Sequence, residues 1–324
     1  MAVVTSSSAG ARLAAGRAFV ARFPPDTELL IVAPTRGAAD DFARDAARRR
    51  STFGLHRFSL VELAAGAAMT DRTATNRVAG TEINLEALAA RVAFDAAEDN
   101  GLAYFGPVAS TPGFPKALAR TIHELRLAAA TSSVLTGAGA GAADLGRLLD
   151  AFDRGLNAAG VDDRAALFIT AAAVWQRGIR WFGCPTLMLD VPLNSVAERR
   201  FVAAVLAGAS DSLVTCPVGD ESTLAELEGL GLEAVAVEDD ASTDTDLGRL
   251  RRRVFMLDPP PAATASGDVR LFSAPGEARE ALEIARRALD EAAAGVPFDE
   301  MAVCLRAPQQ YLSLLEHAFC GVDG

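Results

Sequence analysis

Short apolar runs alternate with longer helical patterns along most of the chain. The clearest runs are Ala2–Val4, Leu29–Ala33, Thr186–Asp190 and Ser212–Cys216. Continuous apolar runs of this length are typical of parallel strands that are buried on both faces. Because helical segments lie between the runs, the pattern predicts an α/β fold built on a parallel sheet.

Two further strands complete this expected frame, at Gly54–Phe58 and Glu233–Val237. The first of them leads into Ser59, which precedes an apolar run and is a suitable N-cap for a helix starting at residue 60. Two more helices are expected between the later strands, at Ser195–Leu206 and Thr223–Leu230.

The pattern changes between residues 81 and 179, where helical periodicity replaces the alternation of strands and helices. After Asn84, the segment LEALAARVAFDAAED places its apolar residues on one helical face. Three more helices are expected, at Phe114–Ala129, Ala142–Ala158 and Asp162–Arg177. The sequence therefore predicts an all-helical subdomain, inserted into an α/β domain made of residues 1–80 and 180–258.

A linker and a second α/β domain are expected next. The linker combines the acidic stretch Glu238–Asp246, an arginine cluster and the prolines that follow Asp258. Residues 262–324 then contain two strand-like segments, Val269–Ser273 and Met301–Leu305, each followed by a helical pattern. A parallel sheet covered on both faces needs more strands than these. The region is therefore expected to be the beginning of a second domain, truncated within this sequence.

The composition limits the classes of function. The chain has 324 residues, a formal net charge of −11 and a single lysine, Lys116. A dedicated nucleic-acid-binding protein carries a basic surface, so this charge argues against that class, although not against one subdomain of a larger DNA enzyme. The cysteines form no zinc motif and are expected to be reduced thiols in the core, with Cys216 and Cys304 in strands. No apolar run reaches the roughly 18 residues of a membrane span, so we expect a cytoplasmic protein without a membrane partner.

The first strand leads into the place where a strand–loop–helix NTPase carries its phosphate loop. In the pattern G-x-x-x-x-G-K-[ST], backbone N–H groups surround the phosphates, the lysine meets their charge and the hydroxyl binds Mg²⁺. Here the segment from Thr5 to Arg12 reads TSSSAGAR. With Gly10 as the second glycine, Ala11 replaces the lysine and Arg12 replaces the hydroxyl. The pattern predicts that the scaffold persists without its nucleotide chemistry.

Later segments resemble, in order, the motifs of superfamily 1 helicases of the UvrD/Rep type. Residues 33–42 (APTRGAADDF) are similar to T-F-T-N-K-A-A-x-E-M, and residues 56–60 (HRFSL) share their end with T-F-H-S-L. Asp190 stands where the motif D-E-x-x begins, and residues 219–223 (GDEST) are similar to G-D-x-x-Q without the glutamine. Residues 302–312 are similar to A-V-L-x-R-x-N-x-Q-S-R through Arg306 and Gln310, but Leu312 replaces the arginine expected at the γ-phosphate.

The residues that are lost are those a helicase needs to hydrolyse ATP. In this respect the chain resembles the AddB-like family, in which a degenerate helicase module precedes a PD-(D/E)XK nuclease domain. The resemblance implies a RecA-like, P-loop-type sheet. It also implies an inactivated helicase module of an exonuclease V-type helicase–nuclease, used in double-strand-break repair and recombination. The nuclease signature is expected beyond Gly324.

The resemblance also assigns candidate residues. The degenerate nucleotide site comprises Ser8, Gly10, Arg12, Asp190, Arg306 and Gln310. The candidate DNA contacts are Thr35, Arg36, Arg57 and Ser59. No catalytic residue, metal ligand or cofactor is expected in this chain. The expected partners are DNA, bound weakly, and the motor subunit of a helicase–nuclease complex.

Two other functions stay open. The first is an ATP-dependent superfamily 1 helicase motor that binds ATP and Mg²⁺ at a non-standard site. The second is a Rossmann-type enzyme acting on a small molecule, although the first loop lacks the G-x-G-x-x-G pattern of that class.

Overall fold

The computed structural model describes residues 2–178, 180–237, 245–254, 258 and 261–321. The chain divides into two compact units. The first comprises Met1–Ala241 with Arg251–Pro259, and the second comprises Ser242–Leu250 with Pro260–Gly324. Each unit has its own hydrophobic core.

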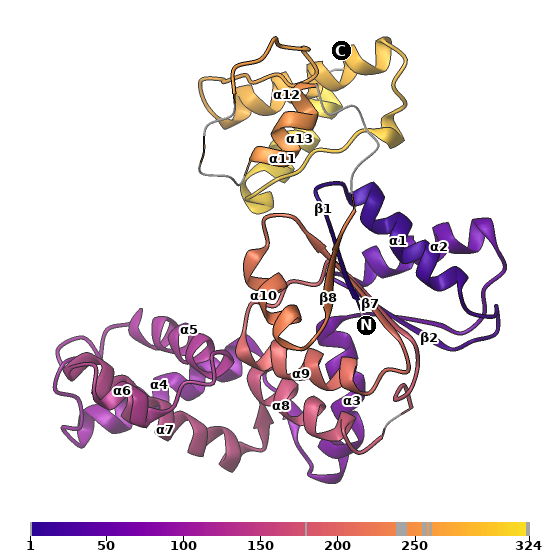
Figure 1. Cartoon of the computed structure of the whole chain (residues 1–324). Helices are drawn as coiled ribbons and strands as arrows, with labels where there is room; N and C mark the ends of the chain where they lie inside the picture. The colour runs from indigo at the N-terminus through magenta and orange to yellow at the C-terminus, as the bar shows by residue number, and fades with distance from the viewer. Residues whose placement is uncertain (1, 179, 238–244, 255–257, 259–260, 322–324) are drawn as a thin grey trace. The chain divides into compact units, whose positions relative to one another are not determined.

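In the described part of the first unit, six parallel strands form one sheet (Figure 1). Their order across the sheet is β3 (Leu55–Ser59), β2 (Leu29–Ala33), β6 (Thr186–Leu189), β7 (Ser212–Pro217), β1 (Ala2–Ser6) and β8 (Glu233–Ala236). The α/β fold with a parallel sheet predicted from the apolar runs is thus confirmed. The first two strands of the chain are not neighbours, because β6 and β7 lie between β1 and β2.

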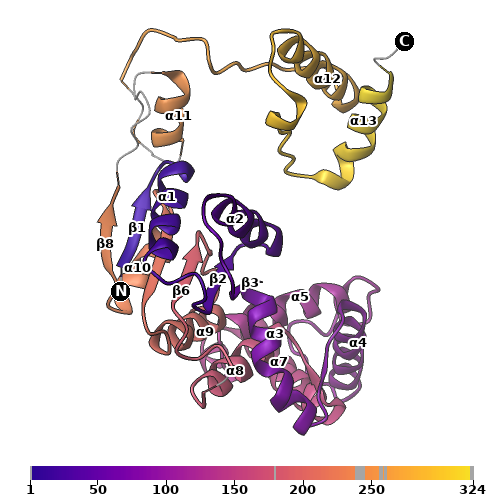
Figure 2. The same cartoon turned by 90° about the vertical axis from the view of Figure 1, so that its right-hand side faces the viewer.

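Helices cover both faces of this sheet (Figure 2). One face carries α1 (Ala9–Ala21) and α2 (Arg36–Arg49). The other face carries α3 (Leu60–Ala74), α8 (Arg164–Trp175), α9 (Val196–Ala207) and α10 (Glu221–Gly229). Successive strand residues enter opposite cores: Leu30 packs with α3 and α8, whereas Ile31 packs with α1 and α2. This double burial explains why the strands are apolar throughout instead of alternating with polar residues.

Serine and threonine caps start several helices directly after strands. Ser59 forms the predicted cap, since the Glu62 amide donates to its Oγ at 3.3 Å and its own amide donates to Glu62 Oε2 at 2.9 Å. The side chains of Thr35 and Ser195 cap α2 and α9, each by accepting a hydrogen bond from the amide three residues later. Each cap satisfies amide groups that would otherwise lack partners at the helix start.

The inserted helical block has a separate core. It contains α4 (Glu82–Glu98), α5 (Phe114–Leu127), α6 (Ser132–Thr136) and α7 (Ala140–Ala159). At its base, β4 (Val78–Ala79) pairs in parallel with β5 (Val161–Asp162). The fourth helix expected in this block, α8, belongs instead to the core of the sheet. It packs against α3 and α9, because Phe168 and Trp175 extend the core of the sheet.

A buried carboxylate fixes the loop between α4 and α5. Asp144, on α7, is 0% exposed and accepts hydrogen bonds from the amides of Ala103, Tyr104 and Phe105 at 3.2, 2.7 and 3.1 Å. Burial by itself raises the pKa of Asp144, but these amides and Arg147 at 3.5 Å outweigh that effect and lower the pKa below its ordinary 3.8. The carboxylate therefore remains ionised while it holds the loop.

The described part of the second unit is helical. It contains η1 (Phe298–Glu300), α12 (Glu277–Ala293) and α13 (Pro308–Gly321), and the last two share a small core of Ala281, Ala285, Leu315 and Ala318. The strands predicted at Val269–Ser273 and Met301–Leu305 are wrong, because neither segment pairs with a neighbouring strand. An apolar segment forms a strand only when its backbone groups find ladder partners. The described residues of this unit supply none.

The structure also differs from the prediction in the expected linker. Part of it forms a helix, α11 (Asp246–Arg253), whereas residues 238–244, 259 and 260 lie outside the described residues. The prediction of core thiols holds for Cys184 and Cys216 but is wrong for Cys304 and Cys320, which are exposed. Cys304 is exposed because its predicted strand does not form. In the described ranges, no helix is both long enough and apolar enough to cross a membrane.

Candidate functional site

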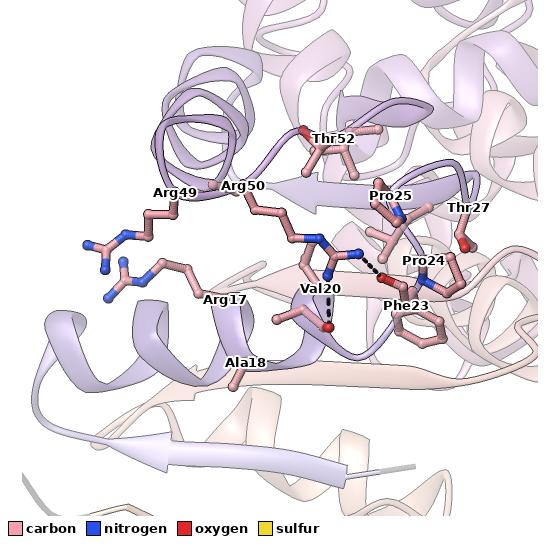
Figure 3. Close-up of a pocket in the computed structure, with 14 residues that line it drawn as sticks. Arg17, Ala18, Val20, Phe23, Pro24, Pro25, Thr27, Arg49, Arg50 and Thr52 are labelled. Carbon is pink, nitrogen blue, oxygen red and sulfur yellow. Dashed lines mark hydrogen bonds between the residues drawn. The ribbon is translucent and has the colours of Figure 1, made fainter.

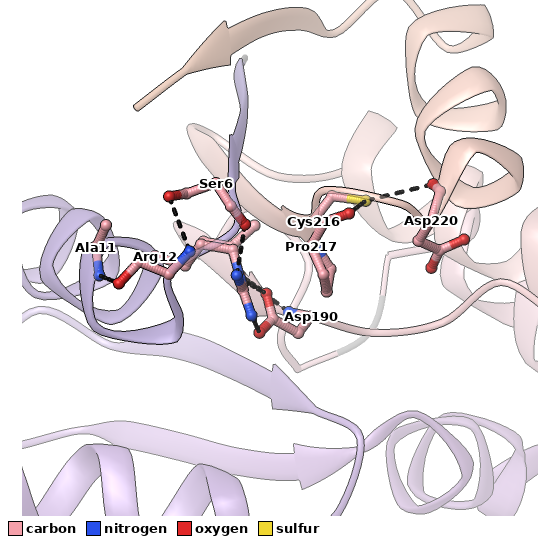
Figure 4. Close-up of polar contacts among 9 residues, drawn as sticks. Ser6, Ala11, Arg12, Asp190, Cys216, Pro217 and Asp220 are labelled. Carbon is pink, nitrogen blue, oxygen red and sulfur yellow. Dashed lines mark hydrogen bonds and ion pairs between the residues drawn. The ribbon is translucent and has the colours of Figure 1, made fainter. Parts of the chain in front are cut away.

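A cavity and the candidate residues lie at opposite ends of the parallel sheet. A cavity of about 260 Å³ lies at the amino end, between α1, α2 and the starts of β2 and β3 (Figure 3). The candidate residues that follow β1 and β6 lie at the opposite, carboxyl end (Figure 4). The candidates near the ends of β2 and β3 belong to the same end of the sheet. In open α/β sheets, ligands bind in the crevice outside the carboxyl ends of the strands. The candidate site is therefore in the expected place, whereas the cavity is not part of it.

The turn after β1 is short. Only Ser7 and Ser8 separate the end of β1 from the start of α1. Ser8 is buried, receives a hydrogen bond from the Ala11 amide at 3.3 Å and donates its own amide to Ser6 Oγ at 3.2 Å. Gly10 lies inside the first turn of the helix, and a Cβ there would only meet Ser8 Oγ at 3.5 Å. Such a turn is an ordinary capped helix start and is too short to surround a phosphate group.

An ion pair joins α1 to the end of β6. The Arg12 side chain donates from Nε to Asp190 Oδ1 at 2.9 Å and from Nη2 to Asp190 Oδ2 at 2.9 Å. Its third nitrogen, Nη1, donates to the carbonyl of Ser6 at 2.6 Å. Thr215 on β7 donates its hydroxyl to Asp190 Oδ1 at 2.7 Å. The structure thus brings Arg12 and Asp190, two of the six candidate residues of the degenerate nucleotide site, into direct contact (Figure 4).

This pair is largely removed from solvent, with side-chain exposures of 8% for Arg12 and 30% for Asp190. The two-point geometry matches the guanidinium fork to the carboxylate, which is the strongest form of such an interaction. An arginine cannot release its proton in a protein, so the site holds a permanent positive charge. The Asp190 backbone has φ +48°, a left-handed conformation that a non-glycine residue adopts only where its surroundings hold it.

Burial disfavours the reactive, ionised form of the neighbouring thiol, Cys216. Burial raises the pKa of Cys216 to about 11, with further contributions from Asp220 and Asp190. Because the thiolate is the reactive form, this thiol is inert at neutral pH. Among the residues that the structure describes, no group of three His, Cys, Asp or Glu side chains could hold a metal ion.

The candidate DNA contacts lie at the ends of β2 and β3. The hydroxyls of Thr35 and Ser59 accept capping hydrogen bonds from Ala38 and Glu62. Arg36 and Arg57 converge on one carboxylate, because each places its Nε within 3.3–3.4 Å of Asp40 Oδ1.

An aromatic ring lies beside these arginines. The Arg36 guanidinium carbon is 5.5 Å from the centre of the Phe58 ring, which contacts Trp181 in an edge-to-face geometry at 5.0 Å. The result is a surface with two half-exposed arginines, one acid and an aromatic ring.

The remaining candidates, Arg306 and Gln310, belong to the second unit. Both side chains are exposed, and Gln310 lies in the first turn of α13. The sequence reasoning missed Ser6, Thr215 and Asp40 as members of the two groups described above. A signal existed only for Asp40, which stands four residues after Arg36 in the expected helix.

The fold and the site thus define an α/β protein with a parallel six-stranded sheet in its described residues and an arginine–aspartate pair at the carboxyl end of the sheet. No protein-family model matches the chain, and a search of curated proteins finds no significant match.

Proposed function

We propose that the chain is an inactivated superfamily 1 helicase module of an AddB-like helicase–nuclease. It serves in double-strand-break repair and recombination as a scaffold that positions DNA or a motor subunit. The observation that supports this function best is the contact between Arg12 and Asp190. In a working site, Mg²⁺ and phosphate lie between the phosphate loop and the metal-binding carboxylate. Here the guanidinium occupies that place and neutralises the carboxylate.

The strand order argues against the classic Rossmann arrangement, and so against a Rossmann-type enzyme. In the Rossmann order 3-2-1-4-5-6, the first strand lies beside the second. In this chain β6 and β7 separate β1 from β2, so Asp190 and Thr215 approach the turn after β1. The helical block between β3 and β6 matches the insertion expected from the resemblance.

The alternative is an ATP-dependent motor with a non-standard site. Mg²⁺ binding at Asp190 would require Arg12 to leave both carboxylate oxygens, and would leave its buried guanidinium without an anionic partner, with only the Ser6 carbonyl as acceptor. Leaving a buried charge unpaired is strongly unfavourable. The geometry therefore favours the scaffold over the motor.

The first prediction concerns nucleotide. The wild-type protein should bind Mg-ATP with a dissociation constant weaker than about 100 μM, which corresponds to about −5.5 kcal/mol. The physical reason is that Arg12 already neutralises Asp190, while Ala11 offers no charge to the phosphates. Isothermal titration calorimetry measures the constant directly.

Tighter binding would contradict the scaffold and favour the motor. In that case Arg12→Ala should change the affinity by about tenfold or more, because the side chain lies at the nucleotide. The surface variant Arg44→Ala is a matched control, since Arg44 is exposed and pairs with exposed Asp41 on the same helix, α2. It should leave ATP binding unchanged.

The second prediction concerns single-stranded DNA. Binding should be weak, with a dissociation constant above about 1 μM at physiological salt, and should weaken further as salt rises. The double variant Arg36→Ala/Arg57→Ala should lower the slope of log affinity against log salt by about 1.4, since each lost phosphate contact on a single strand contributes about 0.7. Fluorescence anisotropy with a labelled oligonucleotide at several salt concentrations tests this.

The double variant Arg22→Ala/Arg48→Ala removes the same charge near the amino end of the sheet, where α1 and α2 end. It controls for the change in net charge. If both double variants alter the slope equally, the surface around Arg36 and Arg57 is not the DNA contact. Binding that stays tight in about 0.3 M salt would contradict the weak electrostatic contact proposed here.

A further inference from the structure

The cavity at the amino end of the sheet has no part in the function proposed above. It has a volume of about 260 Å³ and lies where α1 and α2 end and where β2 and β3 begin. Pockets for drug-sized ligands hold roughly 300–1,000 Å³. This cavity therefore suits a smaller molecule.

The walls of the cavity are mostly apolar and are held in place. Side chains of Val20, Phe23, Leu29 and Leu55 line it, together with the consecutive prolines Pro24 and Pro25. The Phe53 amide donates to the Pro25 carbonyl at 2.7 Å, and the Thr27 amide donates to the Pro24 carbonyl at 3.1 Å. The apolar surface is thus already formed without a ligand, which reduces the ordering cost of binding.

Arg50 crosses between the two helix ends (Figure 3). Its Nη1 donates to the carbonyl of Ala21 at 3.0 Å, and its Nη2 donates to the carbonyl of Phe23 at 2.8 Å. These bonds satisfy carbonyls beyond the last turn of α1, where a cation is also favoured by the helix dipole. Arg50 is therefore a structural member of the wall.

Arg17 and Arg49 add positive charge at one side of the cavity (Figure 3). Both approach the same carboxylate, with Arg17 Nη1 at 3.1 Å from Asp45 Oδ2 and Arg49 Nε at 3.8 Å from Asp45 Oδ1. Of the described residues that line the cavity, the charged ones are all arginines, namely Arg17, Arg49 and Arg50. One carboxylate thus faces two guanidinium groups, which leaves donors able to bind a second anion.

We propose that this cavity is a binding site for a small organic carboxylate with an apolar body. The apolar part fills the space between Val20, Leu29 and Leu55, and the carboxylate meets Arg17 and Arg49 beside Asp45. A guanidinium fork pairs with a carboxylate in two-point geometry. A neutral molecule of the same shape would fill the apolar part and leave the charged side without a partner.

An amide NMR titration with naphthoate tests the site. Naphthoate should bind with a dissociation constant of about 1 mM or tighter, in the range of fragment-sized ligands. Shift changes should concentrate at Ala18, Ala21, Leu29 and Leu55. The neutral isostere naphthamide should bind at least tenfold more weakly, and Arg49→Gln should weaken naphthoate by about fivefold.

Two variants on one helix separate the cavity from the rest of the surface. Ala18 lines the cavity and is exposed, so Ala18→Trp should block it without disturbing the core and abolish naphthoate binding. Ala14→Trp is also exposed and lies one turn away on α1, outside the lining, so it should bind as the wild type does. No detectable naphthoate binding up to about 10 mM, equal affinity for naphthoate and naphthamide, or unchanged binding by Ala18→Trp would each overturn the proposal.

Discussion

Replacing Arg12 with methionine should destabilise the first unit by about 3 kcal/mol, the lower end of the range for breaking a buried ion pair. Methionine keeps much of the length of the side chain, so little packing is lost. Most of the loss in the free energy of unfolding comes from Asp190, because it would keep its charge with Thr215 as its remaining side-chain partner. The Ser6 carbonyl would also lose its bond from Arg12. Urea denaturation followed by circular dichroism gives the free energy of unfolding.

A double-mutant cycle with Asp190→Asn isolates the pair. The double variant Arg12→Met/Asp190→Asn should be more stable than the sum of the single effects predicts, by about 1–3 kcal/mol, because neither partner leaves the other charged. Arg44→Met breaks the exposed pair with Asp41 and should cost less than about 1 kcal/mol. A similarly small effect for Arg12→Met would show that the pair does not hold α1 to β6.

Replacing Asp144 with alanine should destabilise the helical block by about 3 kcal/mol, because three amides lose their buried acceptor at once. The affected amides are those of Ala103, Tyr104 and Phe105. Hydrogen exchange in the loop between α4 and α5 should accelerate in the same variant. Asp150→Ala, on the exposed side of α7, is the matched control and should have little effect. Unchanged exchange in the loop would contradict the anchoring role.

The pH dependence of this effect has a defined direction. Since the folded pKa of Asp144 is lowered, its ionisation stabilises the protein above the unfolded pKa of about 3.9. That contribution is lost as the pH falls below about 4 towards the folded pKa. The stability difference between the wild type and Asp144→Asn should therefore shrink in this acidic range. Unfolding measurements at several pH values check this, and a constant difference would show that the carboxylate is not the source.

The frame of the fold could be predicted because its signals are local. A run such as Leu29–Ala33 is apolar at every position, and the structure buries all five residues on both faces of the sheet. The cap at Ser59 depends on a residue three positions away, which the sequence displays directly. Segments whose structure depends on neighbours could not be predicted. Met301–Leu305 has strand composition, yet it lacks a ladder partner in the described part of its unit.

The candidate site was predictable only in part for the same reason. Ser8, Gly10 and Arg12 lie close together in sequence, and the motif order pointed to Asp190. However, the hydrogen bonds between Arg12 and Asp190 join residues 178 positions apart. A single sequence contains no signal for such a pairing, nor for the cavity formed by the ends of α1 and α2. Arg12 and Asp190 could each be singled out from the sequence, but the ion pair between them could not.

The position of β1 inside the sheet also constrains how the protein folds on the ribosome. Ala2 pairs with Leu213 on one side and with Glu233 on the other, so the first strand made is among the last to find its neighbours. At 5–20 residues per second, about 10–40 s separate the synthesis of β1 from that of β7. During this time β2 and β3 can already pair, while Val3 and Val4 still lack the strands that bury them. A nascent chain with this strand order exposes an apolar, unpaired strand for much of its synthesis, and this favours chaperone binding at β1.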